Sequence, residues 1–307
     1  MSGRRPWAEG DVRGATCVVT GASSGIGRAI ARGLAHRGAT VGVVGRNPER
    51  TEAAVEDVLR AAREGGRGGS ARAFRADFSS LASVVALADA IEAAFPPLDV
   101  LVNNAGLWHN ERKLSADGFE DTFQVNVLAP AMLTLRLVPA MMERRRGRVV
   151  HVSSMQHKAP KAFPFDDLQQ TRRRFRGIRV YGESKLGNVL FSNELARRLE
   201  GTGVTSNAVH PGTVVTNVVR DNAFLSQAIK VAAPFLLTPD DGAVSALRVA
   251  TDPSLAHVSG RYFDHDGSEG VPSAPSKDAR AAERLWGLVF RMGDLDPASL
   301  PAALQPR

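Results

Sequence analysis

Short apolar runs rich in valine alternate along the chain with longer segments whose apolar residues recur about every 3.6 positions. Runs of the first kind are typical of strands buried on both faces of a sheet, and segments of the second kind are typical of amphipathic helices. The valine-rich runs lie at residues 15–20, 40–45, 98–104, 147–154 and 203–211, and a further strand-like stretch without valine lies at 71–78. This alternation predicts an α/β fold with a doubly wound parallel β-sheet, flanked by helices on both faces.

Turn residues separate the predicted elements. The stretch EGGRGG at 64–69 ends one predicted helix, and the two prolines at 96–97 end another. The chain of 307 residues has no internal repeat and no long low-complexity linker, and a chain of this length can bury a full core in one domain. We predict an N-terminal extension (1–13), a single domain (14–294) and a C-terminal tail (295–307). After residue 272 the chain reads as a loop, one amphipathic helix and a frayed end.

The net charge of +7 is carried mostly by arginine and raises the question of a nucleic-acid partner. Most arginines alternate with Glu and Asp, as over residues 46–69, which is typical of solvated helix surface. Two runs are denser, at 142–148 and 171–179. We interpret both as solvated loops or helix ends and predict no nucleic-acid partner. Because the second run lies just before Tyr181, a role in admitting an acidic substrate stays open.

No apolar run approaches the roughly 20 residues of a membrane span, and the first fourteen residues offer no apolar segment to a signal peptide. We therefore expect a cytoplasmic protein without a membrane span. The single cysteine, Cys17, lies in a strand-like run, so we expect a buried, inert thiol and no disulfide. The histidines show no metal-ligand spacing, and we expect no metal.

A glycine-rich turn follows the first predicted strand. Gly21, Gly25 and Gly27 fall where the strand passes into an amphipathic helix, and the next strand follows at the distance expected for a βαβ unit. Absent side chains there let backbone amides approach a pyrophosphate at the positive end of a helix. The turn therefore predicts dinucleotide binding, although a plain tight turn would share the glycines.

The end of the second predicted strand indicates which nicotinamide cofactor fits. An NAD enzyme needs a carboxylate there for the ribose 2′-hydroxyl, and neither Asp nor Glu occupies the strand end. Arg46 lies there instead, and a guanidinium can pair with a 2′-phosphate. We predict NADP(H) as the cofactor; the alternative is an arginine that only caps the turn.

Tyr181 and Lys185 lie four residues apart in a segment of helical pattern, so they share one helix face. A cation beside a phenol favours the phenolate, and so does an oxidised nicotinamide, so we expect the pKa of Tyr181 to be lowered from about 10 toward working pH. A tyrosine tuned in this way can give a proton to a carbonyl oxygen or take one from an alcohol.

Four motifs in order resemble the short-chain dehydrogenase/reductase family. They are TGxxxGIG at 20–27, NNAG at 103–106, YxxxK at 181–185 and HPG at 210–212, and the resemblance spans about Gly14 to Asp294. The sequences YGESKLGNVLF, ADGFEDTFQVN and FPFDDL resemble those of the retinol-dehydrogenase-like branch of this family. The resemblance implies a Rossmann-type fold, hydride transfer between NADP(H) and a carbonyl or alcohol, and a homodimer or homotetramer.

The resemblance also implies roles for single residues. The catalytic group would be Asn126, Ser154, Tyr181 and Lys185, with Ser153 as the alternative serine and Asn126 orienting a water for proton relay; a helix asparagine bonded to a main-chain carbonyl is the alternative for Asn126. Lys185 would also hold the nicotinamide ribose. The cofactor would contact Gly21, Ser23, Ser24, Gly25, Ile26, Gly27, Arg46, Asn47, Asp77, Phe78, Asn104, Ala105, Gly106, Tyr181, Lys185, Pro211, Gly212, Val214 and Thr216.

The substrate side differs from the usual family pattern. Twenty-six residues (155–180) separate Ser154 from Tyr181, and we interpret this insert as extra wall of the substrate pocket. Residues 213–238 are apolar and lie where the family places a lid. The candidate substrate residues are Trp108, Phe163, Phe165 and Phe224, each of which could instead belong to the core. We expect a lipophilic ketone or aldehyde, such as a polyketide, terpenoid or steroid-like carbonyl; the alternative is a catalytically silent NADP-binding regulator on the same fold.

Overall fold

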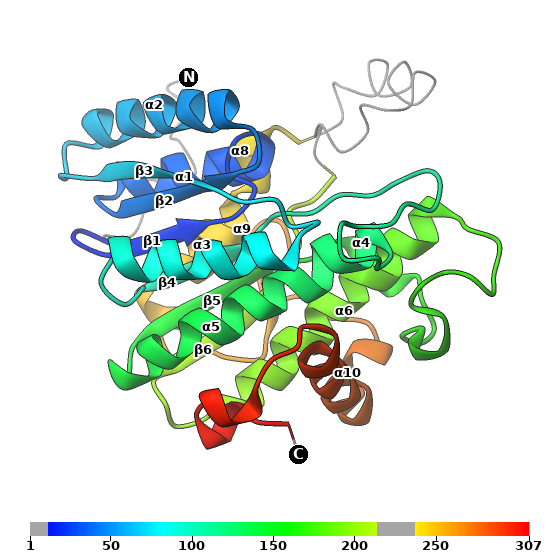
Figure 1. Ribbon diagram of the computed structural model, residues 1–307. Helices are drawn as coiled ribbons and strands as arrows, with labels where there is room; N and C mark the ends of the chain where they lie inside the picture. Colours follow the sequence, from blue (N-terminus) through cyan, green and yellow to red (C-terminus); the bar gives the residue numbers. More distant parts are fainter. Residues whose placement is uncertain (1–11, 214–236, 307) are drawn as a thin grey trace.

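The computed structural model describes residues 12–213 and 237–306. Seven parallel strands form one sheet in the order β3-β2-β1-β4-β5-β6-β7 (Figure 1). Their bounds are β1 Thr16–Val19, β2 Thr40–Gly45, β3 Ser70–Arg75, β4 Val100–Asn103, β5 Gly147–Val152, β6 Val204–Val209 and β7 Tyr262–Phe263. The predicted doubly wound parallel sheet is confirmed, and its order reverses between β1 and β4.

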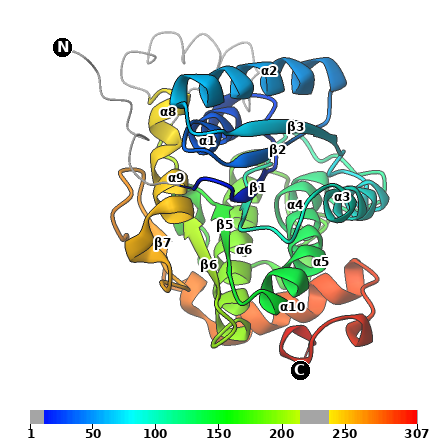
Figure 2. The same cartoon turned by 90° about the vertical axis from the view of Figure 1, so that its left-hand side faces the viewer.

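Two layers of helices cover the sheet. The helices are α1 Gly25–His36, α2 Pro48–Gly65, α3 Leu81–Ala94, α4 Asp121–Phe123, α5 Ala129–Glu143, α6 Gly177–Arg198, α8 Pro239–Gly242, α9 Val244–Thr251 and α10 Ala279–Met292. Figure 2 shows α1, α2 and α9 on one face and α3, α5 and α6 on the other. Each layer buries its own apolar cluster against the strands, so the molecule has one hydrophobic core on each side of the sheet.

Local sequence explains the ends of α2, the helix after the strand that carries Arg46. The Asn47 side chain accepts a hydrogen bond of 2.8 Å from the Arg50 amide, and Pro48 occupies the first turn. The helix ends at Gly66, whose φ of +64° is the left-handed conformation that glycine adopts freely. The helix end predicted at EGGRGG is therefore confirmed.

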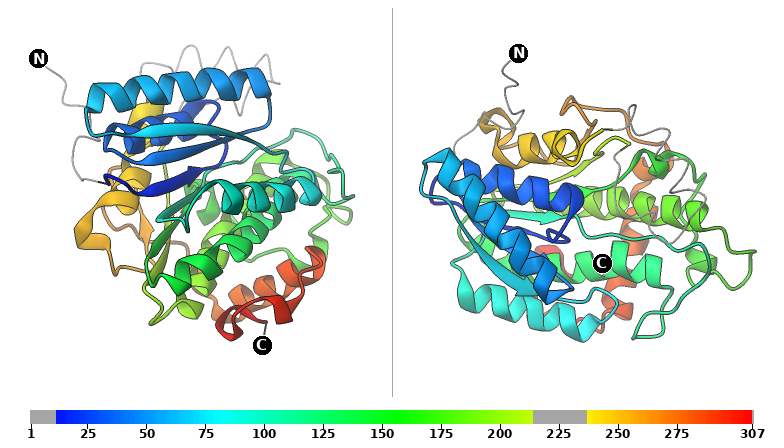
Figure 3. Two further views of the ribbon diagram at one scale, coloured as in Figure 1. Left: turned by 60° about the vertical axis from the view of Figure 1, so that its left-hand side comes forward. Right: turned by 90° about the horizontal axis from the view of Figure 1, so that it is seen from above.

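The C-terminal segment packs against the body of the fold, and the predicted frayed end is wrong for residues 295–306. Figure 3 shows this segment and α10 beside the α5 and α6 layer. Leu304 is fully buried, and its carbonyl accepts a hydrogen bond of 3.0 Å from the Trp286 indole. Arg198 lies 4.5 Å from the Trp286 ring and donates to the Ala303 carbonyl. The tail is thus held by one arginine and one indole of other elements.

One helical run has the length and composition of a membrane span. Within the described part of the chain, Asp121–Glu143 reaches a mean hydropathy of 1.5 in its most apolar window, and 78% of that window is buried inside the protein. Polar residues interrupt the run, so it does not stand out as a continuous apolar stretch in the sequence. Burial against the sheet and α3 is the behaviour of a core helix. Cys17 is fully buried, as predicted, and burial raises the pKa of its thiol.

Candidate active site

A cavity of about 490 Å³ opens at the carboxyl edge of the sheet. It lies beside the neighbouring strands β1 and β4, where the strand order reverses. Parallel α/β sheets bind ligands at such a point. Most of the predicted cofactor residues line it, namely Gly21, Ser23, Ser24, Gly25, Ile26, Gly27, Arg46, Asn47, Asp77, Phe78, Asn104, Ala105, Gly106, Tyr181, Lys185 and Pro211. Gly212 does not line the cavity. Val214 and Thr216 lie outside the described residues.

The glycine turn has no room for a side chain at Gly21, so its backbone stays open to a ligand. Gly21 has φ +65° and Gly25 has φ +55°, and a Cβ on Gly21 would lie 2.9 Å from the Ala105 Cα. Ser24 caps α1 without a side-chain hydrogen bond, so first-turn amides of this helix keep their capacity to bind an anion. The turn therefore fits the pyrophosphate of a dinucleotide.

Thr20, the first residue of the TGxxxGIG motif, holds this turn in place, although it was not among the predicted site residues. The Thr20 hydroxyl accepts hydrogen bonds of 3.0 Å from the amides of Asn104 and Ala105, and the Asn104 side chain donates to the Thr20 carbonyl at 2.8 Å. These bonds join the ends of β1 and β4. The predicted role of Asn104 thus has a structural component, because its amide is committed to the turn.

Arg46 lies exposed at the adenine end of the cavity, directly after β2. Asn47, and not Arg46, supplies the side-chain cap of α2, and the cofactor role of Arg46 stays a prediction. Arg50, one turn further along, lines the same end and was not predicted. Asp77 also lines the cavity, while its carboxylate accepts from the Ser79 amide and hydroxyl at 3.0 and 2.8 Å and so shapes its own turn.

Tyr181 and Lys185 meet at the other end of the cavity, on one face of α6. The Lys185 Nζ lies 5.5 Å from the centre of the Tyr181 ring and donates a hydrogen bond of 2.9 Å to the Val152 carbonyl at the end of β5. The Trp108 ring packs edge-on against Tyr181, with 5.9 Å between ring centres. The phenol is therefore positioned by the neighbouring strand end and by an aromatic wall.

The expected lowering of the tyrosine pKa does not occur in this structure. Burial raises the pKa of Tyr181 to about 12, and a hydrogen bond with the Ser154 side chain opposes this only in part. Burial also lowers the pKa of Lys185 to about 8. Desolvation acts against both charged forms, and the lysine alone does not offset it. The lowering that we predict for lysine and oxidised nicotinamide together stays a prediction. A lowered tyrosine pKa would need the positive charge of an oxidised nicotinamide as well.

The structure distinguishes the two candidate serines. The Ser153 side chain is 1% exposed and donates a hydrogen bond of 2.9 Å to the Lys185 carbonyl, so it ties β5 to α6. Ser154 instead shares a hydrogen bond with Tyr181 and accepts one from the Gln156 amide at 3.2 Å. Ser153 lines the cavity and Ser154 does not, but Ser154 is the serine that is hydrogen-bonded to the phenol. Its role at a substrate oxygen stays a prediction.

Asn126 is buried in a single π-helical turn, Gln124–Leu128, between α4 and α5. Its amide binds both backbone groups of Leu107 at 2.8 Å, and it donates to the Ser184 hydroxyl at 2.9 Å. This is the alternative that we gave for Asn126, a side chain bonded to main chain, and it fixes the segment after β4 beside Tyr181. The water relay stays a prediction.

Two of the predicted substrate residues belong to the core. Phe163 is 7% exposed and packs against Phe123 and Phe165 at 6.5 and 4.9 Å between ring centres, and neither Phe163 nor Phe165 lines the cavity. Both calls were therefore wrong, because the insert folds inward against α6 at these positions. Trp108 does line the cavity. Phe224 lies outside the described residues, as does most of the predicted lid.

No residue of the insert, residues 155–180, lines the described cavity, and the insert packs against other parts of the fold. Two arginines of its basic run bind carboxylates of the fold: Arg173 contacts Asp167 and Glu183 at 2.8 and 3.1 Å, and Arg179 lies 3.7 Å from Glu183. The interpretation of the insert as pocket wall is wrong for the described residues, and its basic run gives no support for admitting an acidic substrate.

His157 holds the turn that carries Ser154, a role that the sequence did not reveal. The ring is fully buried, with Nδ1 2.7 Å from the Ser154 carbonyl and Nε2 accepting from the Ser273 amide at 3.1 Å. A carbonyl only accepts and an amide only donates, so the ring is neutral with its proton on Nδ1. Burial lowers the pKa of His157, which agrees with a neutral ring.

Replacing His157 by Phe should therefore weaken the fold and the site together. The buried Ser273 amide loses its hydrogen-bond partner, which costs about 1–3 kcal/mol of unfolding free energy. The Ser154 carbonyl loses the bond from the ring and keeps the bond of 3.1 Å from the backbone amide of residue 157. We expect a lower Tm and a kcat reduced more than KM. His257→Phe, at an exposed histidine, serves as the matched control. A His157→Phe protein with the parent's Tm and kcat would show that the ring only fills space.

The site defines a class of protein. A glycine turn at the start of α1 shares its cavity with a tyrosine and a lysine on one face of α6, at the reversal point of a parallel sheet. This arrangement fits an oxidoreductase that holds a dinucleotide across the carboxyl edge of the strands. Within the described residues, no group of histidine, cysteine and acidic side chains could hold a metal ion.

Comparisons with known proteins give the family. The family model described as short chain dehydrogenase matches residues 15–164. Human retinol dehydrogenase 12 is 38% identical over 275 residues, which cover 90% of this chain and 85% of that protein. The chain belongs to the short-chain dehydrogenase/reductase family, in its retinol-dehydrogenase-like branch, and so to a family of oxidoreductases that use a nicotinamide cofactor.

Solved structures show the same fold. An uncharacterised protein from Mycobacterium paratuberculosis superimposes with a TM-score of 0.75 at 31% identity, covering 96% of this chain and 99% of that one. A protein from Beutenbergia cavernae, described as an NAD(P)-dependent gluconate 5-dehydrogenase with NADP bound at low occupancy, gives a TM-score of 0.67 at 31% identity, covering 85% and 98%.

Proposed function

We propose that this protein is an NADP(H)-dependent oxidoreductase that reduces a lipophilic ketone or aldehyde, such as a polyketide, terpenoid or steroid-like carbonyl. One observation carries the proposal. A single cavity joins Tyr181 and Lys185 at one end to Arg46 at the other, where β2 ends without a carboxylate. The first end suits proton transfer to an oxygen, and the second suits a 2′-phosphate.

The preference for NADP(H) rests on charge. Arg46 and Arg50 both line the adenine end and are exposed, so a phosphate there would meet two guanidinium groups. A 2′-hydroxyl would find no carboxylate on Arg46, Asn47 or Arg50, the cavity residues that follow β2. The Beutenbergia cavernae protein, solved with NADP, supports the same choice by analogy.

The chain's own groups supply the proton and the orientation. Nicotinamide, when bound, supplies the hydride. The Tyr181 hydroxyl donates its proton to the carbonyl oxygen as that oxygen gains charge, and the Ser154 hydroxyl binds the same oxygen. The Lys185 ammonium favours the phenolate that remains, and the phenolate is then protonated from solvent. The reaction consumes one hydride and one proton and yields the alcohol.

The lipophilic substrate is inferred from the wall around the phenol. Trp108, Leu107, Val125 and Val152 line the cavity near Tyr181, and apolar walls of this kind favour apolar ligands. Relatives named as retinol dehydrogenases carry the name of a lipophilic alcohol, which supports the same class without identifying a compound. The cytoplasmic location and the homodimer or homotetramer stay predictions.

A matched carbonyl panel tests this function. We expect NADPH oxidation with decalones, steroid ketones and long-chain aldehydes, with kcat/KM at least tenfold above that for glyceraldehyde or dihydroxyacetone. Each buried methylene contributes about 0.8 kcal/mol, so two or three of them account for about a tenfold difference. Turnover of the small hydrophilic carbonyls alone would contradict the substrate class. NADPH binding without turnover of any carbonyl would instead indicate a silent regulator.

A further inference from the structure

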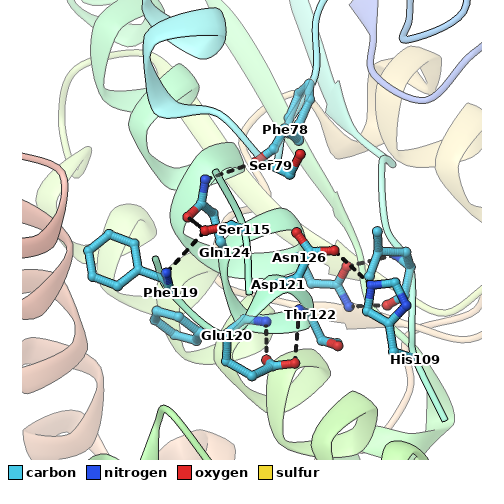
Figure 4. Close-up of polar contacts among 12 residues, drawn as sticks. Phe78, Ser79, His109, Ser115, Phe119, Glu120, Asp121, Thr122, Gln124 and Asn126 are labelled. Carbon is cyan, nitrogen blue, oxygen red and sulfur yellow. Dashed lines mark hydrogen bonds and ion pairs between the residues drawn. The ribbon is translucent and has the colours of Figure 1, made fainter. Parts of the chain in front are cut away.

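His109 and Asp121 form a polar pair inside the same cavity as Tyr181 and Lys185. The His109 Nε2 lies 2.7 Å from the Asp121 Oδ2, and the two side chains are 15% and 12% exposed (Figure 4). They are twelve positions apart in the sequence. Asp121 lies in the stretch ADGFEDTFQVN, but neither residue was among the predicted site residues. The proton transfer assigned to Tyr181 does not use them.

The segment between the two residues folds back as a small hairpin and brings them together. The Asp121 amide donates to the Lys113 carbonyl at 3.0 Å, and Leu114 pairs with Glu120 as an antiparallel bridge. The turn between them contains Gly118 at φ +81°. The hairpin sets Asp121 at the first residue of α4, opposite the segment that leaves β4.

Both members of the pair are held in place. The buried Glu120 carboxylate caps α4 by accepting from the amides of Thr122 and Phe123 at 3.1 and 2.7 Å, as Figure 4 shows. On the other side, the His109 carbonyl lies so close to Gly177 that a Cβ there would collide with it. A side chain fixed by its surroundings in this way is suited to recognise a ligand group at a defined position.

The chemistry of the pair fixes what it can offer. A carboxylate only accepts, so the proton that joins the two side chains lies on Nε2, and the neutral ring presents an acceptor at Nδ1. Among residues 12–213 and 237–306, no group is hydrogen-bonded to Nδ1, and His109 is the only hydrogen-bond donor to the Asp121 carboxylate. With the ring in its neutral form, the pair thus combines an oriented imidazole with an acceptor, Nδ1, that no described residue uses.

We propose that the His109 and Asp121 pair determines substrate specificity by accepting a hydrogen bond from a hydroxyl group of the lipophilic carbonyl substrate. The proposal rests on the proposed function and narrows its substrate class to hydroxylated ketones or aldehydes. The neighbouring wall, with Trp108, Leu107 and Val125, is apolar, so a hydroxyl elsewhere in this part of the pocket would lose its hydrogen bond to water. Asp121 acts through His109, as a positioning residue.

The test compares three kinds of decalone with NADPH: positional isomers of a hydroxydecalone, the matching methyl ethers and the unsubstituted ketone. For the parent enzyme we expect kcat/KM for at least one hydroxydecalone to exceed that for its methyl ether and for decalone by about 10- to 100-fold, because a site built for a hydroxyl leaves its acceptor unpaired otherwise. The methyl ether can accept but not donate, so it should behave like decalone.

Substitutions then assign the effect. His109→Phe keeps a ring and removes the acceptor, so the ratio of hydroxydecalone to decalone should fall to about one, mostly through KM for the hydroxylated ketone. Asp121→Asn leaves the ring but no longer fixes its tautomer, so its ratio should fall in between. Arg112→Ala is the control, because Arg112 anchors the same loop to the Gln169 carbonyl at 2.6 Å and does not line the cavity. It should change Tm and leave the ratio unchanged.

The outcomes separate the two proposals. Equal parent rates for hydroxylated and unsubstituted ketones, or a ratio that survives both His109→Phe and Asp121→Asn, would overturn the role of the pair while leaving carbonyl reduction intact. If His109→Phe does not fold, Asp121→Asn alone decides. If no carbonyl of either panel supports NADPH oxidation by the parent enzyme, the proposed function is overturned, and this inference with it.

Discussion

Tyr181→Phe should reduce kcat for NADPH-dependent carbonyl reduction by about 10³-fold, within the range that a positioned proton donor contributes. The substitution removes the hydroxyl that shares a hydrogen bond with Ser154 and keeps the ring that packs against Trp108. Cofactor binding should therefore stay within about threefold of the parent value. The measurement is kcat by NADPH oxidation, with the Kd for NADPH determined by fluorescence titration.

The chain contains a matched control, because its only other tyrosine is also buried. Tyr262→Phe removes a hydroxyl that has no hydrogen-bond partner among the described residues. It should leave kcat close to that of the parent enzyme. Equal rates for Tyr181→Phe and the parent would remove the proposed mechanism, and equal losses in both variants would point to a general loss of packing.

Arg46→Asp should invert the cofactor preference. The parent enzyme should favour NADPH over NADH, because a hydrogen bond between a guanidinium and a phosphate contributes about 1.5–3 kcal/mol, or roughly 10- to 100-fold in kcat/KM. In the variant, a carboxylate repels the 2′-phosphate and can accept from a 2′-hydroxyl instead. The ratio of kcat/KM for NADPH to that for NADH, with one ketone at a fixed concentration, gives the result.

Arg60→Asp makes the same charge change on α2 outside the cavity, at a side chain 3.5 Å from Asp57. It should leave the cofactor ratio unchanged, which separates a local contact from the general field of the protein. An Arg46→Asp enzyme that still prefers NADPH by the parent ratio would contradict the assignment of Arg46 and transfer the question to Arg50, the second arginine at that end.

The parts of the fold that were predicted depend on short stretches of sequence. Valine-rich runs define β1, β2, β4, β5 and β6, and β3 follows the turn EGGRGG. The glycine turn, the YxxxK spacing and Arg46 each lie within one or two adjacent elements. Strand β7 was missed, because two residues, Tyr262 and Phe263, carry no periodic signal. Its position comes from pairing beside β6, which only the folded chain provides.

The parts of the site that were missed depend on contacts between distant segments. His157 reaches Ser273 over 116 positions, and His109 meets Asp121 only because a hairpin folds back. Phe163 was placed in the pocket from its apolar character, although core packing uses the same property. The sequence also did not show how strongly burial raises the pKa of Tyr181, because burial is a property of the whole fold.

Transfer of deuterium from the nicotinamide ring to a ketone tests the central claim most directly. The enzyme is given NADPH labelled at the hydride-donating carbon, together with the preferred ketone of the lipophilic panel, and the product is analysed by mass spectrometry. The account predicts an alcohol with one deuterium on the former carbonyl carbon, formed by the parent enzyme and about 10³-fold more slowly by Tyr181→Phe. Absence of labelled alcohol with every ketone that the protein binds beside NADPH would contradict it.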